Sequence, residues 1–412
     1  MKDLLYLVHR IPFPPNKGDK IRSFNLLKHL AGRFRVHLGS FVDDPHDWRY
    51  QDEVAAYCES LCLLPLNPRR ARLRSVAGLL SGVPLTVPYY ADRRMALWVS
   101  ETLERGVDHA LVFSAAMAQY LPREQEQLHT VIDFCDVDSD KWRQYAQGHR
   151  FPMNWVYRRE ARTLLGFERR LASACDASVF VSEQEAKLFR ELAPESSARV
   201  HAIDNGVDTD YFSPERDYPD PYKGKGAALV FTGAMDYWAN VDAVTWFAKE
   251  VFPRVRAARS DARFVIVGAR PTPEVRRLEE QPGVHVTGAV QDVRPYLAHA
   301  RAAVAPLRIA RGVQNKVLEA MAMGRPVVAT PQALDGLRDC PEMRWLVAEA
   351  PADLAKLCLQ TLEDGDSAGH GAKGRACVLA HYSWAEHMDR LMALLDAPTA
   401  PEPDVLRAGA GG

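Results

Sequence analysis

The chain has 412 residues, of which 47% are hydrophobic and 25% charged, and its formal net charge is −1. This length exceeds one ordinary hydrophobic core and predicts two domains of about 200 residues each. Near-neutrality argues against a dedicated nucleic-acid binder, and no stretch approaches the roughly 18 apolar residues that span a bilayer. The seven cysteines lack metal-ligand spacing, so we expect reduced thiols and a cytoplasmic protein.

Apolar runs alternate with amphipathic helical stretches, which is typical of a parallel sheet with crossover helices. A helix is predicted at 20–31, because apolar residues recur at helical spacing from Ile21 to Leu30. Ser182 and Glu185 form a capping-box pattern that predicts another helix. Strands of the first half are predicted at 4–8, 34–42, 109–115, 129–134 and 177–182.

The alternation is interrupted by a turn at Asn205 and Gly206 and by a polar, proline-bearing stretch at 213–226. We therefore place a domain boundary here. The predicted parts are a first domain at 1–205, a second at 206–380, a C-terminal helix at 381–396 that crosses back to the first domain, and a disordered tail at 397–412.

Three strands of the second half end in glycine, namely those that lead to Gly233, Gly268 and Gly288. Open α/β sheets bind ligands at the carboxyl ends of their strands, and glycine lets a nucleotide approach the backbone closely. A tight turn explains any one of these glycines taken alone. No G-x-G-x-x-G is present, so a bound dinucleotide is not supported. Strands of this half are predicted at 227–233, 262–268, 284–288, 302–307 and 326–330.

The segment RGVQNKVLEAMAMGRPVVAT, at 311–330, places one carboxylate, Glu319, in an otherwise apolar helix. A carboxylate in such surroundings needs a partner, and two vicinal hydroxyls of a sugar would supply it. The loop from Arg308 to Gln314 leads into the first turn of this helix, whose free N–H groups form an anion site, and Lys316 adds positive charge. The pattern predicts a nucleotide site; a salt-bridged surface glutamate is the alternative.

These motifs resemble those of glycosyltransferase family 4, retaining enzymes of the GT-B fold, over nearly the whole chain. KVLEAMAMGRPVVAT, the glycine-ended strands and NGVDTDYFSP carry the resemblance. IPFPPNKGDKIRSFNLLKHL, YRREARTLLGFERRLA and VAPLRIARGVQNKVLEAMAMG are similar to the sugar transferases associated with exosortase/PEP-CTERM exopolysaccharide loci. The resemblance implies an α/β protein in which two Rossmann-like domains, one for the acceptor and one for the donor, face each other across a cleft.

The resemblance implies roles for residues of the second domain. Glu319 matches the second glutamate of the E-x7-E motif of the family, which binds the donor ribose hydroxyls, and Gly233 lies near the phosphates. Gly312, with the N–H groups of Val313 and Gln314 after it, matches the turn that holds the donor sugar and diphosphate.

Further candidates lie at other strand ends. Gly288 to Val290 match a stretch that contacts the base through its backbone, and Gly18 stands where the family has a glycine-rich loop. His9 follows the first strand and faces the expected cleft, although a structural role is the alternative. Asp133 ends the strand at 129–134, where it either orients an acceptor hydroxyl or caps a loop.

The sequence departs from the family pattern at two places. The position of the first glutamate of the motif is Arg311, and the stretch GAMDYWANVDAV lacks the Arg and Lys that neutralise the leaving diphosphate in many relatives. A leaving diphosphate needs positive charge or hydrogen-bond donors, so we hypothesise that Arg308, Arg311 and Lys316 supply them. Alternatively, Arg311 meets a carboxylate on an acidic donor sugar.

The resemblance implies a retaining glycosyltransferase that moves a sugar from a nucleotide-diphosphate donor to an exopolysaccharide or lipid-linked glycan precursor. Front-face attack needs no defined nucleophile, and the motifs require no metal or other cofactor. A nucleotide-sugar 2-epimerase on the same fold and a non-catalytic nucleotide-sugar-binding protein are the alternatives. No nucleic-acid partner is expected.

The stretch DFCDVDSDKW resembles the start of a calcium loop, because Asp136, Asp138 and Asp140 alternate. Lys141 occupies the position of the invariant glycine of such loops, so acidic capping of a helix is the preferred interpretation.

The stretch NPRRARLRSVAGLLSGVP is basic and amphipathic, with four arginines ahead of a run of apolar residues. Such a segment can lie on an anionic membrane surface, and this would suit a lipid-linked acceptor. Peripheral contact of 69–83 with the inner membrane is one hypothesis, and an ordinary surface helix is the other.

Overall fold

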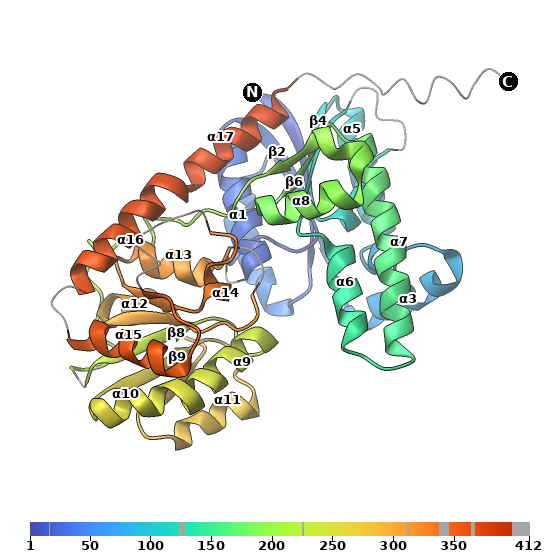
Figure 1. Ribbon diagram of the computed structural model, residues 1–412. Coiled ribbons are helices and arrows are strands. Elements are labelled where there is room, and N and C mark those ends of the chain that lie inside the picture. Colours follow the sequence, from blue (N-terminus) through green and yellow to red (C-terminus); the bar gives the residue numbers. More distant parts are fainter. Residues whose placement is uncertain are drawn as a thin grey trace. The chain divides into compact units, whose positions relative to one another are not determined.

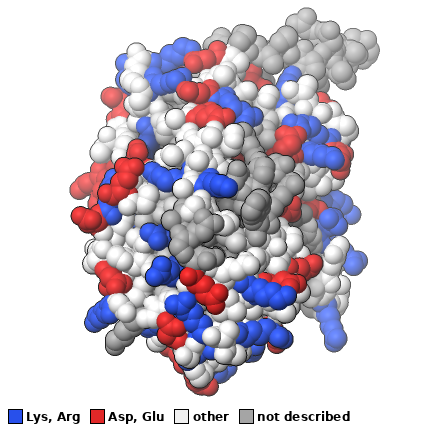
Figure 2. All heavy atoms as spheres, turned by 60° about the vertical axis from the view of Figure 1, so that its left-hand side comes forward, with Lys and Arg blue, Asp and Glu red and all other residues white. Residues whose placement is uncertain are grey.

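The computed structural model describes residues 1–412 except 16, 123–127, 225, 311–312, 338–345, 364–366 and 398–412. The chain divides into two compact units: unit 1 comprises Met1–Ile203 and Met388–Gly412, and unit 2 comprises Asp204–His387. Each unit contains a parallel sheet and a hydrophobic core of its own. Basic and acidic side chains are interspersed on the face drawn in Figure 2, in keeping with the small net charge.

The described residues of unit 1 form a seven-stranded parallel sheet in the order β3-β2-β1-β4-β5-β6-β7 (Figure 1). Its central strands are buried on both faces, which explains why they read as continuous apolar runs in the sequence. The strands are β1 (Lys2–Val8), β2 (Phe34–Val42), β3 (Ser60–Pro65), β4 (His109–Phe113), β5 (His129–Cys135), β6 (Ala177–Phe180) and β7 (Val200–Ala202).

Helices cross over between these strands, and α6 and α7 pack along each other (Figure 1). The helices of unit 1 are α1 (Gly18–Ala31), α2 (Gln51–Ala55), α3 (Pro68–Ser81), α4 (Thr86–Tyr89), α5 (Arg93–Glu104), α6 (Asp138–Gln147), α7 (Met153–Ala174) and α8 (Glu183–Leu192). Short 3₁₀ turns lie at η1 (Pro45–Tyr50), η2 (Ala115–Tyr120) and η3 (Pro194–Arg199).

The described residues of unit 2 form a five-stranded parallel sheet in the order β10-β9-β8-β11-β12. Strands β9 and β10 follow β8 on one side of it, and the chain then returns to place β11 and β12 on its other side. The switch point of the sheet therefore lies between β8 and β11, and ligands bind beyond the carboxyl ends of such strands. The strands are β8 (Ala228–Thr232), β9 (Arg263–Val267), β10 (Val284–Gly288), β11 (Ala302–Ala305) and β12 (Val327–Ala329).

Most of the unit 2 helices follow a strand, as crossover connections require. They are α9 (Trp238–Trp246), α10 (Phe252–Ala258), α11 (Pro273–Arg277), α12 (Arg294–His299), α13 (Asn315–Ala322), α14 (Pro331–Leu334), α15 (Pro351–Glu363) and α16 (Ser367–His381), with short turns at η4 (Phe247–Val251) and η5 (Leu278–Glu280). The last helix, α17 (Trp384–Leu395), begins in unit 2, and its residues from Met388 onward belong to unit 1.

The predicted cap of α8 is confirmed, because the Ser182 hydroxyl accepts a hydrogen bond from the Glu185 N–H at 3.2 Å. The Glu185 carboxylate also accepts a hydrogen bond from the Val137 N–H at 2.7 Å. One residue thus joins the start of α8 to the start of α6.

The thiols are only partly as expected. Cys58, Cys62, Cys135, Cys175 and Cys358 are free, and burial raises the pKa of the Cys175 thiol to about 11. Cys377 is disulfide-bonded, so the prediction of reduced thiols is wrong for this residue. Within the described residues, no helix is long and apolar enough to cross a membrane.

Candidate functional site

The carboxyl edge of the unit 2 sheet is built from the turns that follow β8, β9 and β10. The Gly233 N–H donates to the Val267 carbonyl at 3.0 Å, and the Gly268 N–H donates to the Gly288 carbonyl at 3.2 Å. These bonds link the three predicted glycines along the carboxyl ends of β8, β9 and β10, and Gly233 is the one next to the switch point of the sheet.

Only part of this glycine pattern reflects space for a ligand. A Cβ atom on Gly268 would lie 1.6 Å from the Gly233 carbonyl oxygen, so the backbone of the protein itself requires glycine there. Gly288 has φ of 72°, and a Cβ atom on it would meet nothing within 4 Å. Gly268 therefore fits the tight-turn alternative, whereas the turn at Gly288 borders open space.

Helix α13 carries two charged residues of the predicted site, Lys316 and Glu319. Its opposite face is apolar and fixes the helix in the core, since Val317, Leu318 and Met321 are at most 1% exposed. Lys316 and Glu319 lie three residues apart and therefore share a face. The helix starts after Gln314, whose carbonyl accepts from the Val317 N–H at 2.9 Å.

The Lys316 ammonium lies at the carboxyl edge of β8. Its Nζ donates to the Asn240 Oδ1 at 2.5 Å and sits 4.7 Å from the centre of the Phe231 ring. Burial lowers the pKa of Lys316 to about 8, and the Glu319 charge opposes this shift. An ammonium has three N–H donors, so this contact leaves capacity for the oxygen atoms of an anion.

The Glu319 carboxylate is half-buried and accepts no hydrogen bond from the described residues. Burial raises the pKa of Glu319 to about 7, and Lys316 opposes this shift. A desolvated carboxylate without donors is unfavourable by itself, and such groups cluster where a ligand supplies the missing donors. Among the described residues, which leave out Arg311, Glu319 has no ion pair within 4.0 Å.

Asn240, in α9, was not predicted as a site residue. It is 5% exposed, and its Nδ2 donates to the Ala234 carbonyl at 2.9 Å, which fixes the Oδ1 that Lys316 contacts. A Cβ atom on Gly233 would lie 2.7 Å from this amide nitrogen, so the glycine makes room for Asn240. The sequence signal for Asn240 was a polar residue in the stretch GAMDYWANVDAV, which contains no Arg or Lys.

The loop after β11 is described only in part, because Arg311 and Gly312 are not among the described residues. The Arg308 Nε donates to the Asp242 Oδ2 at 3.0 Å, and its guanidinium lies 5.6 Å from the centre of the Trp246 ring. Part of its positive charge is therefore already matched. Val313 packs against the core. Arg311 and Gly312 lie outside the described residues, so their proposed contacts stay predictions.

The stretch predicted to contact the base, residues 288–290, is followed in the chain by Arg294, which stacks on Tyr211. Val290 packs against the unit 2 core, and the Arg294 guanidinium lies 3.7 Å from the centre of the Tyr211 ring. Arg294 also pairs with Asp292 at 2.7 Å, which fixes its plane. Burial raises the pKa of Tyr211, and the charges of Asp292 and Glu319 add to this shift.

Of the candidates in unit 1, His9 has structural partners. The His9 Nε2 lies 3.3 Å from Asp19, and its ring stacks on Phe113 with centroids 5.7 Å apart. Gly18 begins α1, and a Cβ atom on it would meet nothing within 4 Å.

Asp133 is fully buried. Its Oδ2 accepts from the Arg22 Nε at 2.7 Å, and its Oδ1 accepts from the Cys135 N–H at 3.0 Å. The hydrogen bond from the Cys135 N–H corresponds to the loop-capping alternative.

The aspartates at 136–140 are matched by neighbouring cations. Lys141 donates to Asp136 at 2.6 Å and to Asp138 at 3.1 Å, and Asp140 accepts from Arg143 at 2.6 Å. Asp138 and Asp140 lie in the first turn of α6, where negative charge is favourable. The described residues contain no cluster of metal ligands.

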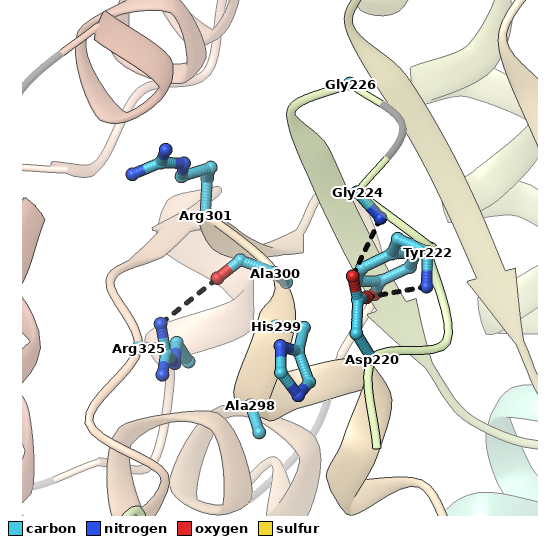
Figure 3. A pocket seen from close by; sticks show the side chains of 9 residues that line it. All are labelled: Asp220, Tyr222, Gly224, Gly226, Ala298, His299, Ala300, Arg301 and Arg325. Carbon is cyan, nitrogen blue, oxygen red and sulfur yellow. Dashed lines mark hydrogen bonds between the residues drawn. The ribbon is translucent and has the colours of Figure 1, made fainter. Parts of the chain in front are cut away.

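A separate pocket of about 390 Å³ lies at the amino ends of the strands of the unit 2 sheet (Figure 3). Gly226, Arg301 and Arg325 line it, and they precede β8, β11 and β12. The Arg325 guanidinium donates to the Ala300 carbonyl at 3.3 Å, and Asp220 accepts from backbone N–H groups. Because it lies at the amino ends of the strands, this pocket does not belong to the candidate nucleotide site.

Comparison with known families supports the interpretation of unit 2. Residues 226–364 match the family model described as "Glycosyl transferases group 1". None of the curated protein sequences matches the chain.

Solved structures share the fold of the whole chain at low sequence identity. Anabaena Alr3699/HepE in complex with UDP and glucose has 14% identity and a TM-score of 0.64, and the match covers 97% of this chain and 100% of that one. WaaG, a glycosyltransferase involved in lipopolysaccharide biosynthesis, has 15% identity and a TM-score of 0.65, covering 96% and 100%. A glycosyltransferase from Rickettsia africae has 13% identity and a TM-score of 0.63, also covering 96% and 100%.

The two parallel-sheet α/β units thus match GT-B glycosyltransferase structures, which confirms the predicted fold class. The matched domain of residues 226–364 contains the glycines, Lys316 and Glu319. The family match and the GT-B fold together support a glycosyltransferase enzyme.

Proposed function

We propose that the protein is a retaining glycosyltransferase of family 4 that transfers a sugar from a nucleoside-diphosphate donor to an exopolysaccharide or a lipid-linked glycan precursor. The observation that carries the proposal is the pair of desolvated charges, Lys316 and Glu319, on one face of α13 beside the switch point of the sheet. HepE was solved with UDP-glucose, which supports a nucleotide sugar as the donor.

The donor would lie with its ribose hydroxyls donating to the Glu319 carboxylate. Its diphosphate would accept hydrogen bonds from Lys316 and from the first N–H groups of α13. When the bond from the anomeric carbon to the phosphate oxygen breaks, negative charge grows on the diphosphate, and these donors stabilise it. The acceptor hydroxyl attacks from the face of the leaving group, and a donor phosphate oxygen takes its proton, so no step is assigned to a metal.

The acceptor class and the location rest on the sequence. The resemblance to PEP-CTERM-associated sugar transferases supports an exopolysaccharide precursor, and the basic segment at 69–83 supports a lipid-linked one. We accordingly place the protein in the cytoplasm, in peripheral contact with the inner membrane.

The test is product analysis with candidate nucleotide sugars, with and without a polyprenyl-phosphate-linked acceptor. Transfer to the acceptor with the anomeric configuration kept, and its loss in Glu319→Ala, would support the proposal. An epimerised donor formed without acceptor would establish the 2-epimerase alternative. Nucleotide binding without hydrolysis or transfer of any donor would establish a binding protein.

A further inference from the structure

Two neighbouring helical elements of unit 1 expose large apolar side chains. Phe151, two residues before α7, is 81% exposed, and Trp155 in the first turn of α7 is 54% exposed. On α3, Leu73 is 75% and Val76 is 56% exposed. Exposed side chains of this size are common singly, but a concentration of them on adjacent elements marks an interaction surface.

Hydrogen bonds fix these elements to each other. The buried Arg159 of α7 donates to the Gly78 carbonyl of α3 at 2.5 Å and to the Val83 carbonyl at 3.2 Å. Trp155 lies one turn before Arg159, and Val76 lies two residues before Gly78. The exposed apolar residues therefore belong to one side of unit 1, where α3 and α7 adjoin (Figure 1).

Basic residues share the outward faces of both elements. Arg69 and Arg72 are spaced with Val76 at i, i+3 and i+7, and Arg158 and Arg162 follow Trp155 at i+3 and i+7. All four guanidinium groups are on exposed residues, and none pairs with a carboxylate of the described residues. We define the α3–α7 face by the exposed residues Arg69, Arg70, Arg72, Leu73, Val76, Phe151, Trp155, Arg158 and Arg162.

Acidic residues are missing from the same stretches of sequence. Residues 60–91 contain no Asp or Glu, and 141–167 contain only Glu160. Glu160 is 1% exposed, and its carboxylate accepts from the Leu85 N–H at 2.7 Å and the Thr86 hydroxyl at 2.9 Å. The charge of the α3–α7 face thus has one sign, in contrast to the mixed face drawn in Figure 2.

We propose that the α3–α7 face docks unit 1 on the surface of an anionic lipid bilayer. The arginines would meet lipid phosphates, while Phe151, Trp155, Leu73 and Val76 would enter the boundary between headgroups and acyl chains. A tryptophan beside arginines suits this boundary, because its ring is apolar and its N–H reaches polar groups. The proposal extends the predicted contact of 69–83 to a second helix, and it requires neither a bound nucleotide nor transfer activity.

The test is co-sedimentation with vesicles of phosphatidylcholine alone or mixed with phosphatidylglycerol, at low and high salt. Wild type should pellet with the anionic vesicles and much less with the neutral ones, and salt should reduce binding. Arg69→Gln/Arg70→Gln/Arg72→Gln and Phe151→Ser/Trp155→Ser should each weaken the partition at least tenfold. Arg254→Gln/Arg276→Gln/Arg277→Gln, which removes three positive charges from exposed arginines of unit 2, should leave the partition unchanged.

Other outcomes overturn the proposal. Equal losses in the two arginine variants would mean non-specific charge attraction. Wild type that fails to bind anionic vesicles, or that sediments without vesicles through the same residues, would assign the face to a protein partner or a second copy. Thermal melts with and without nucleoside diphosphate control for folding. Vesicle binding without any nucleotide response would leave this proposal standing while the proposed donor site fails.

Discussion

At the scale of single residues, Glu319 and Lys316 hold opposite charges in surroundings that disfavour both. Burial raises the pKa of the carboxyl to about 7 and lowers that of the ammonium to about 8. Both groups are charged together only in a narrow range near neutral pH. A diphosphate on Lys316 and ribose hydroxyls on Glu319 would restore the interactions that water supplies elsewhere.

The unliganded protein should become more stable when Glu319 is replaced by Gln. Because the folded-state pKa is raised above the ordinary value of 4.5, the carboxyl loses stabilisation as the pH rises from about 4.5 to about 7. Desolvation exceeds the attraction of Lys316, so the variant should gain about 1–3 kcal/mol at pH 8 and much less at pH 5. Urea unfolding at both pH values measures this. A variant that is less stable than wild type at pH 8 would show that the carboxylate is satisfied in the unliganded fold.

Lys316 and Arg308 should differ in their importance for nucleotide affinity. The charge of Arg308 is matched by Asp242, whereas Lys316 contacts a neutral amide. Lys316→Ala should weaken the binding of nucleoside diphosphate by about 2 kcal/mol, or roughly thirtyfold, while Arg308→Ala should change it by less than about threefold. Isothermal titration of both variants decides this. Equal losses would mean that Arg308 leaves Asp242 and joins the phosphates.

At the scale of elements, the strand-end turns of unit 2 provide a contrast between two glycines. Gly268→Ala would force a Cβ atom against the Gly233 carbonyl and should destabilise the fold by more than about 3 kcal/mol. Gly288→Ala meets no atom and retains only the left-handed strain of about 1–2 kcal/mol. Denaturant unfolding of the two variants tests the assignment. Similar destabilisation by both would contradict the backbone contact assigned to Gly268.

Most strands could be predicted, because buried parallel strands are continuous apolar runs. The two that were missed explain why some could not. β3 is only partly buried along most of its length, and β7 has three residues, so neither produces a long apolar signal. The start of α8 could be predicted from local chemistry, because the Ser182 side chain caps it.

Sequence reasoning can detect the local signals of the proposed site, but it cannot detect pairs of residues that are far apart in the chain. The apolar surroundings of Glu319 are visible in the sequence, because they come from the same helix. Pairing of Asn240 with Lys316, of Asp242 with Arg308, and of Arg22 with Asp133 joins residues far apart in the chain. A sequence pattern carries no information about such partners, so Asn240 was missed.

At the scale of the whole molecule, two units with separate cores share one chain. Lys316 and Glu319, on which the proposed nucleotide site rests, belong to unit 2. Unfolding of such a chain need not follow a two-state transition. A donor nucleotide should therefore stabilise unit 2 specifically and leave unit 1 to unfold at its own temperature.

The central claim is that Lys316 and Glu319 hold a nucleoside diphosphate, and a calorimetric melt with UDP, GDP, ADP or dTDP tests it most directly. At about a hundred times its dissociation constant, the correct nucleotide should stabilise unit 2 by roughly 2.7 kcal/mol. We predict this shift for one nucleotide, with or without EDTA, and its loss in Glu319→Ala. No shift with any of the four, or a shift that survives in Glu319→Ala, would contradict the account.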